Sequence, residues 1–103
     1  MKLTPRPTAV VLLFDELAPG ALRAIKNENL KIPADVSLVG FNDSPVAKLL
    51  EVPLTTVHYP SQQVGETTAE VLEKLIGGQK FEQVRWTLPA ELVIRSSTGP
   101  VAI

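Results

Sequence analysis

Polar side chains follow two apolar runs of this chain, at the points where strands would end. Residues 8–14 are followed by Asp15, and residues 36–41 are followed by the polar segment 42–44. Residues 36–41 are apolar enough for a strand that is covered on both faces, as in a parallel sheet, and residues 8–14 form a continuous apolar run that is long enough for a buried strand. Ligands of open parallel sheets bind outside the carboxyl ends of the strands. These polar residues are therefore candidates for hydrogen bonding to a small ligand.

The same residues also have a purely structural interpretation. Asp15 can cap a helix that starts after the first run, and Ser44 can cap a short helix with Pro45 at its first position. The dipeptide Asn42-Asp43 can form a turn. The residues alone leave the binding and the structural interpretations open.

Catalytic chemistry has few candidate residues. A nucleophile needs a base and an orienting group, but the chain has one histidine, His58, no cysteine and no Gly-x-Ser-x-Gly elbow. His58 is expected to be structural or to lie at a cleft edge. Gly77-Gly78 reads as a helix stop, because no Lys-Ser/Thr pair follows it. We therefore predict that the protein is not an enzyme and has no catalytic residue, metal site or cofactor.

The composition argues against a DNA-binding face and against a membrane span. With 103 residues, 45% of them hydrophobic and 20% charged, the chain can form a folded domain with a core. The net charge is −1 and the ten basic residues are scattered, which argues against a DNA-binding face. No apolar run approaches the roughly 18 residues of a membrane span. The N-terminal segment holds two prolines and no apolar stretch, so no secretory signal is expected.

Hydrophobic periodicity predicts an α/β fold with a largely parallel sheet and flanking helices. Pro19 falls in the first turn of the first predicted helix, and Val84 and Trp86 share one face of a late strand. The tail after residue 97 is expected to be loose. The expected elements are a strand at 8–14, a helix at 15–28, a strand at 36–41, a short helix at 45–50, a strand at 54–59, a helix at 61–76, and strands at 82–88 and 90–97.

Several segments together resemble the LacI/GalR family of bacterial transcriptional regulators. Residues 36–43 read Val-Ser-Leu-Val-Gly-Phe-Asn-Asp, and residues 53–57 read Pro-Leu-Thr-Thr-Val. Residues 6–11, 15–24 and 88–98 resemble further family segments in the expected order. The resemblance implies a partial periplasmic-binding-protein-like fold. Residues 1–103 would be a C-terminal fragment of the effector-binding and dimerisation domain, without the DNA-binding headpiece.

The resemblance also implies an effector site at the two strand ends. Phe14 stands where the family usually has Asn, and Asn42 stands where it usually has Asp. Phe14 cannot accept a hydrogen bond, but it can stack on a sugar ring. These departures put the usual sugar chemistry in question. The effector-binding candidates are Phe14, Asp15, Asn42, Asp43 and Tyr59.

Two helical stripes resemble the positions through which family members dimerise, although each could also simply cover the sheet. A third stripe, on the helix at 61–76, would lie without a partner and favour association. A homodimer or a higher oligomer is therefore expected. The dimer-interface candidates are Leu17, Ala18, Ala21, Val46, Ala47, Leu49 and Leu50.

The function that the resemblance implies is ligand sensing and dimerisation in a transcriptional regulator. A small effector, sugar-like, would be coupled to DNA binding by a helix-turn-helix domain outside these residues. The expected location is the cytoplasm, with no membrane partner. The alternative is a fragment of a periplasmic-type sugar-binding protein, which shares the fold.

Overall fold

A computed structural model describes residues 4–83 and 85–102, and these divide into two compact units. The first, which we call the strand unit, takes in the described residues of Met1–His58 and Glu91–Ile103. The second, the helix unit, takes in the described residues of Tyr59–Ala90.

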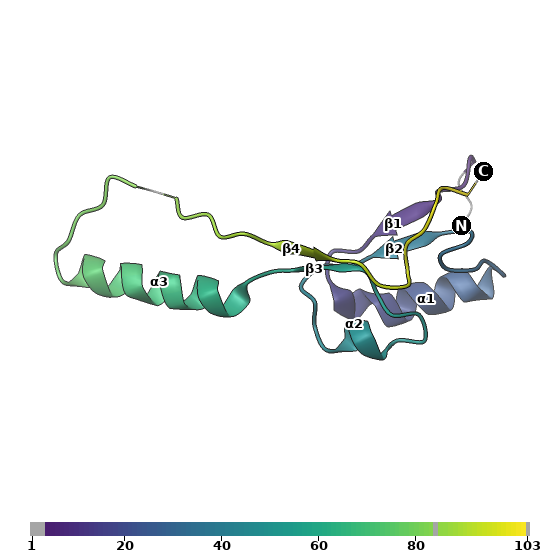
Figure 1. The fold of residues 1–103 in the computed structure, drawn as a ribbon, viewed down its shortest axis with the longest axis horizontal. Coiled ribbons are helices and arrows are strands. Elements are labelled where there is room, and N and C mark those ends of the chain that lie inside the picture. The colour runs from purple at the N-terminus through teal and green to yellow at the C-terminus, as the bar shows by residue number, and fades with distance from the viewer. Residues whose placement is uncertain (1–3, 84, 103) are drawn as a thin grey trace. The chain divides into compact units, whose positions relative to one another are not determined.

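The strand unit holds all of the strands found in the described part of the chain (Figure 1). Its sequence elements come in the predicted order, although each strand is shorter than its apolar run. They are β1 (Ala9–Val11), a 3-10 turn η1 (Asp15–Leu17), α1 (Ala18–Asn27), β2 (Ser37–Val39), α2 (Val46–Leu49), β3 (Thr56–His58) and β4 (Glu91–Val93).

The strands form two short ladders. β1 pairs with β2 in parallel, with Val10 opposite Leu38, and β3 pairs with β4 antiparallel, with Val57 opposite Leu92. A parallel bridge between Val39 and Thr55 continues from β2 toward β3. The α/β arrangement is as predicted. A largely parallel sheet is not confirmed, because one ladder is parallel and the other antiparallel.

The core lies between the β1–β2 ladder and the helices α1 and α2, which lie on the same side of it (Figure 1). Leu38 of β2 and Ile25 of α1 are both buried there. On β1, Val10 packs against this core, whereas Val11 of β1 and Leu13, two residues beyond it, are each 78% exposed. The prediction of a buried strand at 8–14 is therefore wrong for one of its faces, because helices cover only the other. The buried apolar residues are Ala18, Ile25, Val36, Leu38, Ala47 and Leu54.

The helix unit consists of α3 (Ser61–Ile76) and the chain that follows it. Both bounds agree with the prediction. α3 ends at Gly77-Gly78, and Gly78 has a φ of +93°, which glycine adopts without a steric penalty. No residue of α3 is buried within the described chain, and Leu72, Leu75 and Ile76 are at least half exposed.

The strand predicted at 82–88 is wrong for the residues that the structure describes there. Residues 82, 83 and 85–88 are not in a strand, and Val84 lies outside the described residues. Trp86 instead packs edge-on against Phe81, with 5.4 Å between the ring centroids. Alternating residues form a strand only beside another strand, and the helix unit holds none among its described residues. Neither α3 nor any other helix in residues 4–83 and 85–102 is long and apolar enough to cross a membrane.

Candidate functional site

The carboxyl ends of β1 and β2 meet at one edge of the strand unit. The Leu12 amide donates to the Val39 carbonyl over 2.7 Å, and the Asp15 amide donates to the Phe41 carbonyl over 3.1 Å. The chain then turns through Asn42 and Asp43, whose φ values are +103° and +51°. Asn and Asp tolerate this left-handed region better than most residues. The predicted meeting of the two polar strand ends is therefore present.

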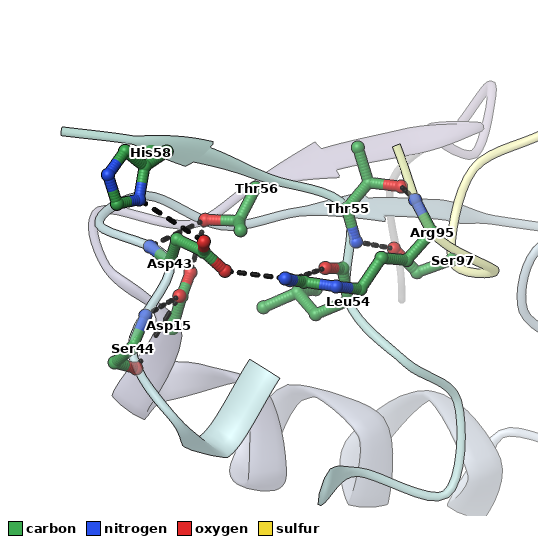
Figure 2. Close-up of polar contacts among 9 residues, drawn as sticks. All are labelled: Asp15, Asp43, Ser44, Leu54, Thr55, Thr56, His58, Arg95 and Ser97. Carbon is green, nitrogen blue, oxygen red and sulfur yellow. Dashed lines mark hydrogen bonds and ion pairs between the residues drawn. The ribbon is translucent and has the colours of Figure 1, made fainter. Parts of the chain in front are cut away.

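Asp15 lies fully buried at the centre of this edge (Figure 2). Its Oδ1 accepts a hydrogen bond from the Thr56 hydroxyl over 2.7 Å. Its Oδ2 accepts from the Ser44 amide over 2.8 Å and from the Ser44 hydroxyl over 3.4 Å. The carboxylate thus joins the segments after β1 and β2 to β3. The structural prediction that Asp15 caps a helix is wrong in detail, because its oxygens face these partners and η1 has no side-chain cap.

Gly40 makes room for this buried carboxylate. A Cβ atom at position 40 would clash with Asp15 Oδ1 and would lie 2.7 Å from Leu54 Cδ2. Any larger residue would displace one of them. Gly40, which directly follows β2, therefore helps to position Asp15.

Ser44 also differs from its predicted structural role. Its carbonyl accepts from the Ala47 amide, but its side chain does not cap α2, and Pro45 is the N-cap residue. The hydroxyl turns to Asp15 instead. As a cap, the hydroxyl oxygen would accept a hydrogen bond from a backbone amide, whereas here the hydroxyl donates to a carboxylate.

Asp43 lies between two cationic or polar partners (Figure 2). Its Oδ1 is 2.6 Å from Nη2 of Arg95, and its Oδ2 is 3.2 Å from Nδ1 of His58. Burial raises the pKa of Asp43, but hydrogen bonding and charge from Arg95, and then from His58, outweigh burial and lower the pKa below its ordinary value. Asp43 is therefore held as a carboxylate within the protein.

Arg95 was not among the residues singled out from the sequence. Its guanidinium also donates to the Leu54 carbonyl over 3.0 Å, and its amide donates to the Thr55 hydroxyl over 2.9 Å. The sequence does hold one indication of its role, because Arg95 is a single cation in the apolar run around Leu92 and Ile94. A charge placed there needs a partner when the strand is partly covered.

Two candidates at this edge remain accessible. The Phe14 side chain is 41% exposed, and Asn42 is exposed. Tyr59 belongs to the helix unit, where it lines a hollow together with Trp86. Within the described residues, no group of three or more His, Asp or Glu side chains is arranged to hold a metal ion.

The dimer candidates fall into accessible and inaccessible residues. Leu17 and Leu49 are exposed, at 43% and 81%. Ala21, Val46 and Leu50 are partly exposed. Ala18 and Ala47 have no exposed surface, so their side chains lie in the core and offer no contact to a partner.

The chain is similar to a known protein family and to solved structures of transcriptional regulators. A family model described as a periplasmic binding protein-like domain matches residues 1–98. The transcriptional regulator CelR in complex with cellobiose superposes with a TM-score of 0.83 at 35% identity, covering 91% of this chain and 29% of that one. The Lac repressor dimer bound to operator and the anti-inducer ONPF superposes with a TM-score of 0.81 at 36% identity, covering 89% of this chain and 32% of that one.

Two curated relatives narrow the class further. The lactose operon repressor of Rhizobium radiobacter is 38% identical over 97 residues, which are 94% of this chain and 85% of that sequence. The HTH-type transcriptional regulator MalR of Streptomyces coelicolor is 42% identical over 92 residues, which are 89% of this chain but only 27% of that protein. The chain belongs to the periplasmic binding protein-like family, among the effector-binding regions of LacI/GalR-type regulators. These relatives are named as regulators and not as enzymes, which agrees at the family level with the prediction of no catalytic activity.

Proposed function

We propose that this chain is the C-terminal part of the effector-binding and dimerisation region of a LacI/GalR-type transcriptional regulator. A small sugar-like effector binds at the carboxyl ends of β1 and β2. Binding is coupled to a helix-turn-helix domain outside these 103 residues, and the regulator acts in the cytoplasm. The curated relatives are regulators, so they favour this reading over a periplasmic sugar-binding protein.

The observation that carries this proposal is the strand-end edge itself. Asp15 joins Ser44 to Thr56, and Asp43 is fastened to Arg95, so the turn after β2 is held in one conformation. Phe14 and Asn42 stand exposed on this framework. A rigid edge with an aromatic ring and an amide suits a ligand that has both hydroxyls and an apolar face. Solved relatives carry cellobiose, sucrose and lactose, which supports a sugar as the effector.

A titration with disaccharides tests this proposal. Cellobiose, lactose and sucrose are added to the isotope-labelled chain, and amide chemical shifts are followed by NMR. We expect millimolar binding by at least one sugar, because a single strand-end edge surrounds only part of a ligand, with shifts centred on residues 14 and 42. Asn42→Ala should weaken binding several-fold.

Asn27→Ala is the matched control, since Asn27 is an exposed amide at the end of α1. It should leave the affinity unchanged. Shifts that avoid the strand-end edge, or an equal effect of the two variants, would contradict the proposed site. The same chain should not select an operator sequence in a mobility-shift assay, because its ten basic residues are offset by eleven acidic ones.

The proposed dimerisation role rests on Leu17 and Leu49, the candidates that are exposed in the strand unit. Burying a leucine contributes about 1.5–3 kcal/mol, so Leu49→Glu should weaken self-association by at least tenfold in light scattering. Val101→Glu is the control, because Val101 is also exposed but lies outside both stripes. A monomeric starting protein, or equal weakening by both variants, would contradict this part of the proposal.

A further inference from the structure

We infer that the strand-end edge selects an uncharged effector with a flat apolar face, such as an aryl glycoside, through Phe14, and that neither strand-end aspartate contacts the effector. This inference rests on the proposed function, because it names the class of ligand for the same edge. It follows from which groups are accessible there and which are engaged inside the protein.

Asp15 has no surface to offer a ligand. Its side chain is fully buried, and both of its oxygens accept hydrogen bonds from the Thr56 hydroxyl and from Ser44. The Gly40 backbone closes the space beside Oδ1, where even a Cβ atom would not fit. A ligand hydroxyl could reach Asp15 only by breaking the links between β3 and the turn after β2.

Asp43 is engaged in a different way, through charge. Nη2 of Arg95 lies 2.6 Å from one carboxylate oxygen of Asp43, and Nδ1 of His58 lies 3.2 Å from the other. Only 14% of the Asp43 side chain is exposed. A ligand that bound this carboxylate would have to displace His58 from Oδ2 or Arg95 from Oδ1, and the Arg95 guanidinium also donates to the Leu54 carbonyl. Losing a charge-assisted hydrogen bond of this kind is costly in a partly buried site.

With both aspartates engaged inside the protein, an aromatic ring and an amide are the groups at this edge that a ligand can contact. Phe14 has an extended backbone and a side chain that is 41% exposed, and Asn42 offers one donor and one acceptor group to solvent. Phenyl rings bind flat apolar surfaces by offset or edge-on packing, and an amide binds hydroxyls without selecting a charge.

A matched pair of probes tests the role of Phe14. Phenyl β-D-glucopyranoside and methyl β-D-glucopyranoside share the sugar and differ in the aromatic ring. Their dissociation constants with the 103-residue chain are measured by NMR titration. We expect the phenyl glycoside to bind about three- to tenfold more tightly, the range given by one aromatic contact.

Three variants separate stacking from loss of fold. Phe14→Ala should bring the phenyl-to-methyl ratio close to one, and Phe14→Leu, which keeps apolar volume without a ring, should retain only part of the preference. Leu13→Ala is the control, because Leu13 is the exposed neighbour on the same strand run. It should keep the full ratio. Glucosamine, whose ammonium group would seek a carboxylate, should bind no more tightly than glucose.

The outcomes distinguish this inference from the proposed function. Equal binding of the two glycosides, a ratio that survives Phe14→Ala, or a tenfold preference for glucosamine would overturn the inference and leave sugar binding at the edge intact. Shifts by neither glycoside, glucose nor glucosamine would overturn both. A phenyl preference that is lost only in the Phe14 variants would support both.

Discussion

The strand unit and the helix unit each contain an amphipathic helix, but the two helices have different surroundings. α1 buries Ala18 and Ile25 against the strands, and part-buried neighbours such as Leu22 pack beside them. α3 is longer, yet none of its residues is buried among the described residues of the chain. An apolar stripe therefore predicts where a helix can pack, while a neighbouring layer decides whether it does.

The polar residues differ between the units in the same way. In the strand unit, buried groups such as Asp15, Thr56 and Ser97 have hydrogen-bond partners far away in the sequence. In the helix unit, side-chain hydrogen bonds such as those from Gln62 to Glu66 and from Thr68 to the Val64 carbonyl join residues four positions apart. Long-range polar contacts thus accompany the unit that has a core, and stability should be concentrated there.

The largest expected difference is between two identical truncations. Leu38→Ala removes a fully buried side chain from the strand unit and should lower the free energy of unfolding by about 2–5 kcal/mol. Leu75→Ala acts on a half-exposed side chain of α3 and should cost less than about 0.5 kcal/mol. Urea denaturation followed by circular dichroism measures both. Equal losses would mean that α3 is buried against something in solution.

Removing the buried carboxylate should have the next largest effect. Asp15→Ala leaves the Thr56 hydroxyl and the Ser44 amide without their acceptor, and hydrogen bonds to a charged group contribute about 1.5–3 kcal/mol each. We expect a loss of about 3 kcal/mol or more in the same denaturation assay. Glu16→Ala, at the exposed adjacent residue, should change stability by under about 0.5 kcal/mol. If both variants were equally stable, Asp15 would not hold the turn.

Two glycine substitutions should change stability in opposite directions. Gly40→Ala forces a Cβ atom against Asp15 and Leu54 and should destabilise the strand unit by about 1–3 kcal/mol. Gly65→Ala places a Cβ atom in open space on α3 and should stabilise that helix by about 0.5–1 kcal/mol. Thermal unfolding of the two variants gives the signs. A tolerated Gly40→Ala would show that the strand end can relax away from Asp15.

The smallest expected effect is a change in how stability depends on pH. Because the pKa of Asp43 is lowered on folding, its stabilising contribution is present above the unfolded value, near 3.8, and is lost as the pH falls through the folded value. Asp43→Asn should therefore be less stable than the parent at neutral pH and lose less stability below about pH 4. In an Arg95→Met background the same substitution should have a reduced effect, since the main partner is gone. Parallel pH profiles of parent and variant would contradict this assignment.

Features that depend on local pattern could be predicted from the sequence. The bounds of α3 and its stop at Gly77-Gly78 follow from short-range periodicity and turn residues, whereas the meeting of the polar strand ends was expected from the rule for parallel sheets and from the family resemblance. The roles of the aspartates could not be predicted in this way. Asp15 meets Thr56 across 41 positions and Asp43 meets Arg95 across 52, and no local signal reports such a pairing.

The failed strand at 82–88 has a related physical cause. Its alternation was sound as a pattern, but a ladder needs a partner strand, and the described part of the helix unit has none. Likewise, residues 8–14 are apolar on both faces, although only the face with Val10 meets the core. Sequence shows which surfaces could be covered, while tertiary structure decides which of them are.

Intermolecular NOEs between a bound disaccharide and the aromatic side chains would locate the effector site, because each unit has its own aromatic groups. We expect NOEs from cellobiose to the Phe14 ring and to the Asn42 side-chain amide in the strand unit. NOEs confined to Trp86 and Thr67, which line a hollow of the helix unit, would contradict it and move the effector site away from the strand ends.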